Sequence, residues 1–154
     1  MKMNRWARGG LIAALYVVLV FAFQFASFGA FQFRVAEALT LLPMVFPEAI
    51  GGIYVGVMLA NILGGFGPWD IFGGSLVSLI AAYLTYRYRH TWFGYASPII
   101  LNAFLVSLYL RFVFELPFSY WFLVFSIGIS EAVVVLGLGI PLLRFVERHQ
   151  SIFL

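Results

Sequence analysis

The sequence predicts an all-α membrane protein, a bundle of six transmembrane helices in one domain (residues 1–154) with both termini in the cytoplasm. Hydrophobic residues make up 64% of the chain and charged residues 10%, and the mean hydropathy is +1.03. A soluble domain of this size could not bury so much apolar surface. The long apolar segments are separated by prolines, which end or start helices, and the basic residues lie at segment ends. The expected surroundings are therefore a lipid bilayer.

Each apolar segment is interpreted as one membrane crossing. The first is uncharged and, at about 1.5 Å per residue, covers roughly 27 Å of a hydrocarbon core about 30 Å thick. It is treated as a retained helix and not as a signal peptide, because no small-x-small cleavage site follows it. The six expected spans are residues 9–26, 35–46, 48–65, 70–87, 97–114 and 120–143.

The shortest segment, 35–46, is counted as a crossing because of the basic residues. It would cover only about 18 Å as an α-helix. The positive-inside rule places three basic clusters in the cytoplasm, and this needs an even number of crossings between them. Six spans satisfy the rule and five do not, so 35–46 is expected to cross as a short or partly re-entrant segment. The clusters are Lys2/Arg5/Arg8, Arg87/Arg89/His90 and Arg144/Arg148/His149.

Several function classes find no support in the sequence. The chain has no cysteine, and its two histidines, His90 and His149, stand beside arginines with no carboxylate at metal-ligand spacing. No GxSxG, HExxH or P-loop pattern occurs. The basic residues are scattered, which disfavours nucleic-acid binding. The sequence therefore predicts no catalytic residue, metal or cofactor on this chain, and an active transporter would need a partner ATPase or an ion gradient.

Glu131 is the strongest candidate for a functional residue. It lies ten or more residues from either end of the last span. A carboxylate near the midplane costs at least about 2.5 kcal/mol on insertion scales, so such residues face the bundle interior and mark a ligand or proton path. The alternative is a buried structural pair, for instance with Asn102 or a tyrosine hydroxyl.

A second group of candidates is expected at the outer mouth of the bundle. Arg34 and Glu37 stand at the start of the second span, where they could gate a pocket, lie at the headgroup level or favour the helix N-terminus. Asn61 and Asn102 lie inside spans, where interhelical hydrogen bonding is the alternative to ligand contact. The remaining candidates are an acidic residue, Asp70, and two aromatic residues at span ends, Trp69 and Tyr120, which could also belong to the ordinary aromatic belt.

Small residues at the start of the first helix suggest a docking surface. Gly9 with Ala13, and Gly10 with Ala14, are small-xxx-small pairs that let another helix approach closely. The alternative is packing within this chain.

Three stretches resemble one known family. They are SFGAFQFRVAEALTLLPMVFPEAIGGIYVG, LANILGGFGPWDIFGGSLVSLIAAYLTYR and PIILNAFLV. They resemble the QueT family, substrate-binding (S) components of energy-coupling factor (ECF) transporters for queuosine precursors, and the likeness runs from about Leu11 to Glu147. The resemblance implies a six-helix bundle of the S-component type, with a cavity open to the outside and capped by the loop after helix one. It also implies a membrane coupling subunit and two ATPase subunits as partners, with ATP used on those chains, and a bacterial plasma membrane as the location.

The implied ligand fits the candidate residues. A 7-deazaguanine such as 7-aminomethyl-7-deazaguanine (preQ1) has N–H donors that a carboxylate can accept, a cationic arm and a flat ring for stacking. Another flat cationic vitamin such as thiamine would need the same groups. Two rival functions are a stand-alone carrier driven by an ion gradient, with Glu131 as the coupling carboxylate, and an intramembrane enzyme.

Overall fold

The computed structural model describes residues 3–27 and 33–153, and all regular structure in that part of the chain is helical. The helices are α1 (Arg5–Ala22), α2 (Gln24–Ser27), α3 (Ala49–Leu63), α4 (Ser75–Arg87), α5 (Trp92–Leu101), α6 (Ser107–Phe112), α7 (Tyr120–Val134), α8 (Ile140–Arg148) and α9 (Gln150–Phe153). A 3₁₀ helix, η1 (Val35–Met44), and three π-helical segments, η2 (Trp69–Gly74), η3 (Asn102–Val106) and η4 (Val135–Gly139), complete the set.

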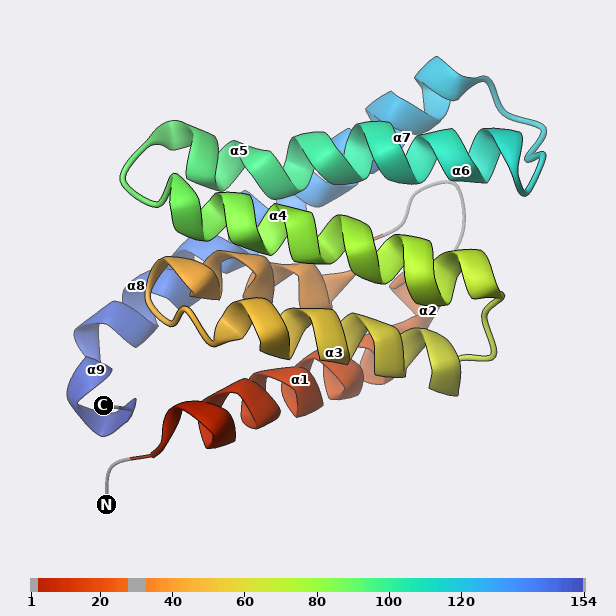
Figure 1. Ribbon diagram of the computed structural model, residues 1–154. Helices are drawn as coiled ribbons and strands as arrows, with labels where there is room; N and C mark the ends of the chain where they lie inside the picture. Colours follow the sequence, from red (N-terminus) through yellow and green to blue (C-terminus); the bar gives the residue numbers. More distant parts are fainter. Residues whose placement is uncertain (1–2, 28–32, 154) are drawn as a thin grey trace.

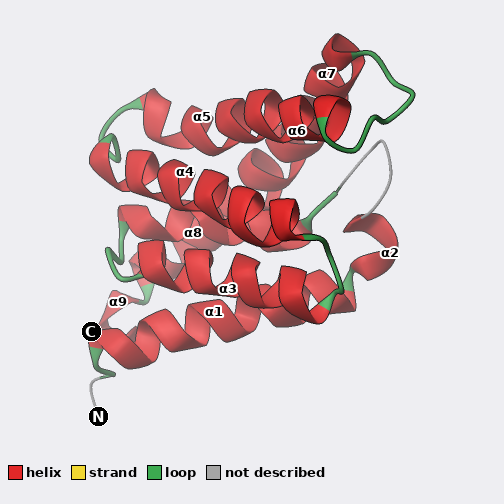
Figure 2. Ribbon diagram, turned by 45° about the vertical axis from the view of Figure 1, so that its right-hand side comes forward, coloured by secondary structure: helices red, strands yellow, loops and turns green. Residues whose placement is uncertain are grey.

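The π-helical segments join their neighbours into longer rods. η2 continues into α4, η3 connects α5 to α6, and η4 connects α7 to α8 without a break in helical backbone. With α1, η1 and α3, these rods correspond in number and order to the six predicted spans. Figure 1 shows the α-helical rods lying side by side in one bundle, and Figure 2 shows the same arrangement from a second direction, with the described connections drawn in green.

Three of these rods are long and apolar enough to cross a membrane: Arg5–Ala22, Trp92–Phe112 and Tyr120–Arg148. Val35–Met44 and Ala49–Leu63 are shorter apolar helices. The predicted all-helical membrane bundle is therefore confirmed at the level of a multi-pass protein. The six crossings and the cytoplasmic location of the termini remain predictions.

The polarity of the bundle is the reverse of that of a soluble protein. Large apolar side chains cover the outer faces, for example Val18 on α1 and Phe125 on α7, which are 60% and 68% exposed. Hydroxyl, amide and carboxylate side chains lie inside, including Thr40, Ser130 and Glu131. Lipid can solvate the apolar exterior, and the protein interior must satisfy the polar groups.

The described members of the three basic clusters, from Arg5 onward, lie at one end of the bundle. Figure 1 places both chain termini and the α4–α5 connection at the same end, and α4 and α8 end at Arg87 and Arg148. We call this the basic end. The prediction that these clusters share one side of the bundle is confirmed.

Two helix starts differ from the predicted spans. α1 begins at Arg5 because the Asn4 side chain caps it, accepting a hydrogen bond from the Ala7 N–H at 2.8 Å. The fifth rod begins at Trp92 and not at residue 97, so Pro98 lies inside the helix. Proline cannot donate to the carbonyl of Gly94, and the Ser97 hydroxyl donates to it at 3.3 Å. A neighbouring hydroxyl therefore allows the helix to pass through a proline.

Segment 35–46 is an interior element, not a regular transmembrane α-helix. Residues 36–43 are all buried, and ten residues of 3₁₀ helix cover about 20 Å. Arg34 lies beside Tyr16 and Val20 of α1, whereas Glu48 pairs with Arg8 near the start of α1. The segment thus runs through most of the length of the bundle. Such backbone is tolerated at membrane depth because protein encloses it.

Helix α1 packs along α3 through small residues. A Cβ atom added at Gly52 would lie 2.6 Å from the Gly9 carbonyl oxygen, and one at Gly56 would lie 2.8 Å from the Tyr16 Cβ. Both distances are shorter than side chains accept, so glycine is required for this close approach.

The topology prediction can be tested by cysteine labelling, since the chain has no natural cysteine. A cysteine at Gly65, in the α3–α4 connection, should react with an impermeant maleimide added to intact cells. A cysteine at His90, at the basic end, should react only after the membrane is opened. The reverse pattern would contradict cytoplasmic termini.

Candidate functional site

Polar side chains from most of the rods meet inside the bundle, away from the basic end. We call this set the polar cluster. Its members are linked by hydrogen bonds, electrostatic interactions or a shared cavity: Tyr16, Arg34, Glu37, Asn61, Asp70, Asn102, Tyr109 and Glu131.

Glu37 is enclosed in the bundle. Its side chain is 2% exposed, and its Oε1 accepts a hydrogen bond from the Tyr16 hydroxyl at 2.5 Å. Its Oε2 is buried and has no hydrogen-bond partner among the described residues. The expectation that Glu37 lies at a water-exposed mouth is therefore wrong. The reason is that η1 lies inside the bundle, packed against α1, α4 and η4, so its first turn is covered on all sides.

Glu131 is buried as predicted. Its surroundings agree with both predicted alternatives, a pair with Asn102 and a contact with a ligand. It lies on α7 with 5% exposure, and its carboxylate forms a hydrogen bond with the Asn102 side chain at the start of η3. Its Oε2, like that of Glu37, finds no hydrogen-bond partner in the described part of the chain. A carboxylate oxygen without a hydrogen-bond partner is costly to bury, which points to a ligand that supplies a hydrogen-bond donor.

Arg34 is the cation of the polar cluster. It interacts electrostatically with Glu37, Glu131 and Asp70. The Asp70 carboxylate also forms a hydrogen bond with the Tyr109 side chain, and the Asp70 carbonyl accepts one from the Asn61 amide at 2.7 Å. Three carboxylates thus share the electrostatic influence of one guanidinium, and a positively charged ligand would balance the remaining negative charge. No group of three His, Asp or Glu side chains within residues 3–27 and 33–153 could hold a metal ion.

A small cavity lies at the edge of the polar cluster. It measures about 10 Å³, and Tyr16, Arg34, Asn61 and Phe66 are among its lining residues. That volume holds about one water molecule. A ring-sized ligand therefore requires these walls to separate. The predicted capping loop includes residues 28–32, which lie outside the described residues.

Two predicted site residues stand apart from the polar cluster. Trp69 is 59% exposed on η2. The Tyr120 hydroxyl donates to the Phe104 carbonyl at 3.1 Å, and its ring packs edge-on against Trp121 at 5.4 Å. Both positions match the aromatic-belt alternative.

Sequence reasoning missed two tyrosines of the polar cluster. Tyr16 continues the buried stripe of Ile12 and Val20 on α1, and a hydroxyl on such a stripe needs an internal partner. Tyr109 follows Asn102 by seven residues, which is nearly two helical turns and hence one side of the rod. Those spacings are the signals that could have identified both residues.

The π-helical segments coincide with the polar cluster. Asp70 lies in η2, Asn102 begins η3, and η4 starts four residues after Glu131. A π segment inserts an extra residue into a helix and re-aims the side chains beside it, and such segments are frequent at functional sites.

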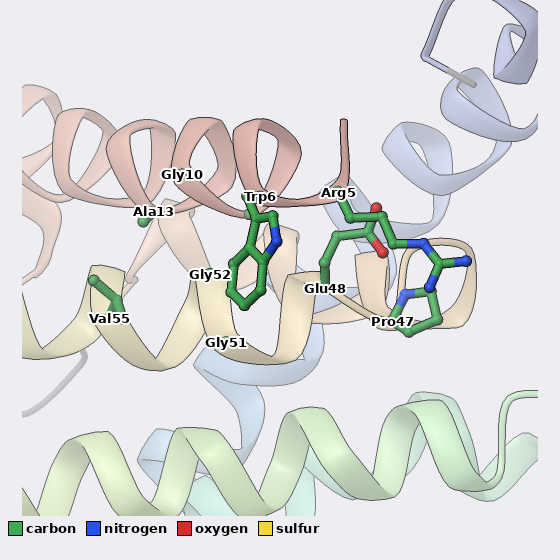
Figure 3. Close-up of a pocket in the computed structure, with 10 residues that line it drawn as sticks. Arg5, Trp6, Gly10, Ala13, Pro47, Glu48, Gly51, Gly52 and Val55 are labelled. Atoms are coloured by element: carbon green, nitrogen blue, oxygen red, sulfur yellow. The ribbon is translucent and has the colours of Figure 1, made fainter. Parts of the chain in front are cut away.

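The small residues of α1 divide into two faces. Ala13 is buried and Gly9 faces the Glu48 carbonyl, so these two pack within the chain. Gly10 and Ala14 are exposed. Gly10 borders a groove of about 690 Å³ between α1 and α3, which Gly51 and Val55 also line. In Figure 3, Trp6 extends from α1 toward Gly51 and Gly52 across this groove.

One end of the groove is held by an unpredicted buried arginine. Arg8 forms an ion pair with Glu48, which lines the groove, and donates to the Phe153 carbonyl oxygen at 2.7 Å. Its guanidinium also lies 5.2 Å from the centre of the Phe46 ring. Arg8 therefore joins α1, the start of α3 and α9, a structural role that its place in a basic cluster did not reveal.

Comparison with known proteins assigns this architecture to a family. A family described as "QueT transporter" matches residues 6–148. The chain belongs to the QueT transporter family. It is 29% identical over 124 residues to the Queuosine precursor transporter QueT of Lactococcus lactis subsp. cremoris (strain MG1363), an alignment that covers 70% of this chain and 73% of that protein. No solved structure matches the chain.

The family assignment confirms the predicted resemblance and gives the QueT chain a transport role. Transport moves a substrate across the bilayer without converting it, so a buried binding site in a membrane bundle is the expected centre. The polar cluster is the strongest candidate for that centre in the described part of the chain.

The stability of a Glu131→Gln variant distinguishes a binding residue from a structural pair. Glutamine keeps an acceptor for Asn102 and removes the buried carboxylate, so we expect the melting temperature of the purified chain in detergent to stay equal or rise. A Ser130→Ala variant, which removes a buried hydroxyl bonded within α7, serves as the control. A clear fall for Glu131→Gln beyond that of the control would indicate that the carboxylate is there for stability.

Proposed function

We propose that this QueT chain is the substrate-binding component of an ECF uptake transporter in a bacterial plasma membrane. It binds a queuosine precursor, a 7-deazaguanine such as preQ1, from the outside and delivers it by docking to a membrane coupling subunit that carries two ATPase subunits. The observation that carries the proposal is the pair of buried carboxylate oxygens on Glu37 and Glu131 that have no hydrogen-bond partner among the described residues.

The chemistry of the ligand class supports the assignment. A 7-deazaguanine offers N–H donors on its ring edge, and preQ1 adds a cationic aminomethyl arm. Both Glu37 and Glu131 can accept such donors through an oxygen that the described chain leaves free. The relative from Lactococcus lactis is named for queuosine precursors, which points to the same substrate class.

The ATP-driven mechanism is inferred from the absence of a nucleotide-binding motif and from the exposed small residues. The sequence contains no P-loop, so the energy must come from elsewhere. Gly10 and Ala14 present a face without bulky side chains, next to the α1–α3 groove. A partner helix can approach such a face closely.

Calorimetric titration of preQ1 into the purified chain tests the substrate. Glu131→Gln and Glu37→Gln should each weaken binding by about 1.5 to 3 kcal/mol, roughly 10-fold to 150-fold, because each removes a charge-assisted hydrogen bond. Both effects are expected to be of similar size, since both carboxylates are buried and neither is screened by water. If the parent chain binds another flat cationic vitamin and not preQ1, the substrate assignment is wrong.

Substitution of the exposed glycine tests docking. Gly10→Leu should abolish uptake in cells with the ATPase partners while leaving preQ1 binding by the purified chain intact, because an added side chain at Gly10 meets nothing within 4 Å inside this chain. Gly137→Leu, at an exposed glycine with equally open space on η4, should leave uptake unchanged. Uptake into vesicles that lack any ATPase would favour the ion-gradient carrier.

A further inference from the structure

The two oxygens of the Glu37 carboxylate have different surroundings. Oε1 accepts the Tyr16 hydroxyl at 2.5 Å, whereas Oε2 has no hydrogen-bond partner among the described residues. Tyr16 is a neutral donor, so it fixes the carboxylate without cancelling its charge. One free, charged oxygen at a fixed position suits a single-point donor such as an ammonium group.

The surroundings of Glu131 suit a different chemical group. Its carboxylate is hydrogen-bonded to the Asn102 side chain, so the pair offers carboxylate acceptors next to an amide. The amide nitrogen carries two N–H donors, and one remains after it bonds the carboxylate. Acceptors beside a donor complement the edge of a guanine-type ring, which presents two N–H groups beside a carbonyl.

Arg34 cannot favour a cationic ligand over a neutral one, because like charges repel. Its electrostatic interactions reach Glu37, Glu131 and Asp70 alike. It therefore offsets part of the acidic charge at all three carboxylates. Selection for charge must come from the residue whose free oxygen meets the charged group.

We propose that Glu37 reads the positive charge of the ligand and that Tyr16 is its positioning residue, while Glu131 with Asn102 reads the ring edge. This division of roles rests on the proposed function. It makes Glu37 the specificity-determining residue between ligands that share a 7-deazaguanine ring and differ in the charge of the substituent.

The packing of α1 on α3 supports the role of Tyr16. Tyr16 is 1% exposed, and its Cβ lies so close to Gly56 that a Cβ there would be 2.8 Å away. The base of the side chain therefore has little room to move. The helix contact fixes where the hydroxyl is held, and the hydroxyl fixes the Glu37 carboxylate.

The test compares two ring-matched compounds by calorimetric titration of the purified full chain in detergent. These are preQ1, which is cationic, and 7-cyano-7-deazaguanine, whose nitrile is neutral. The parent chain should prefer preQ1 by roughly 10-fold to 150-fold, the ratio expected for one charge-assisted hydrogen bond. Glu37→Gln should reduce the preference to less than about 3-fold while the nitrile compound still binds.

Three further variants separate positioning from general structural damage. Tyr16→Phe should lower the same preference by roughly 3-fold to 10-fold without changing nitrile binding, since it removes only the hydrogen bond that holds Glu37. Glu131→Gln should weaken both compounds to a similar degree and keep their ratio. Tyr95→Phe, which alters a half-buried tyrosine packed near Leu41 and Val135, should change nothing.

The outcomes distinguish this inference from the proposed function. A full preference for preQ1 in Glu37→Gln, or equal binding of both compounds by the parent chain, would overturn the charge-reading role and leave the substrate class standing. If the parent chain bound neither compound, the proposed function would fail and this inference with it. If Glu37→Gln does not fold, the nearly isosteric Tyr16→Phe decides, and an unchanged ratio there contradicts the positioning role.

Discussion

The constraint on which this structure depends is that polar groups at membrane depth must be enclosed by protein. Glu37 and Glu131 are nearly completely buried in a bundle whose outer faces are apolar. Lipid offers no hydrogen bonds, so each carboxylate needs partners from neighbouring rods or from a ligand. Tyr16 and Asn102 supply one partner each, and the second oxygen of each carboxylate has no hydrogen-bond partner within residues 3–27 and 33–153. The incomplete satisfaction of both residues is the reason for proposing the polar cluster as a binding site.

The irregular backbone of the chain follows from the same constraint. η1 is 3₁₀-helical over ten residues, and η2, η3 and η4 are π-helical. η1, η2 and η3 contain residues of the polar cluster, and η4 begins four residues after Glu131. Protein covers the backbone at these places. Such departures from α-geometry re-aim side chains such as Asp70 and Asn102 that a regular helix would direct elsewhere. The regular helix α1 instead has one face packed on α3 and one exposed face, which includes Gly10 and Ala14.

In the proposed function, ligand binding and docking use different ends of the bundle. The polar cluster lies away from the basic end, and the α1–α3 groove lies near it, where Arg8 and Glu48 join α1 to α3. Arg8 also binds the Phe153 carbonyl, which ties α9 to the same place. Helix α1 belongs to both regions, since Tyr16 holds Glu37 and Gly10 borders the groove. The proposed ligand site and the proposed docking face therefore share one helix, whose close contact with α3 depends on Gly52 and Gly56.

The sequence alone determined the solvent, the helical class, the order of the segments and one buried carboxylate, Glu131, because hydropathy, proline positions and the cost of a midplane charge are local properties of the chain. The positive-inside rule also predicted from the sequence that the basic clusters share one end of the bundle. Only the tertiary structure decided that Glu37 is buried and that Tyr16 and Tyr109 join the polar cluster. It also decided that Trp69 and Tyr120 lie apart from that cluster. On α1 it decided that Gly9 and Ala13 face inward, whereas Gly10 and Ala14 face outward. These outcomes depend on how rods far apart in sequence pack, on the path of η1 through the bundle and on the residues added by π segments. Spacing within one helix indicates which side a residue such as Tyr16 or Tyr109 occupies, but not which side chains of other rods meet it there.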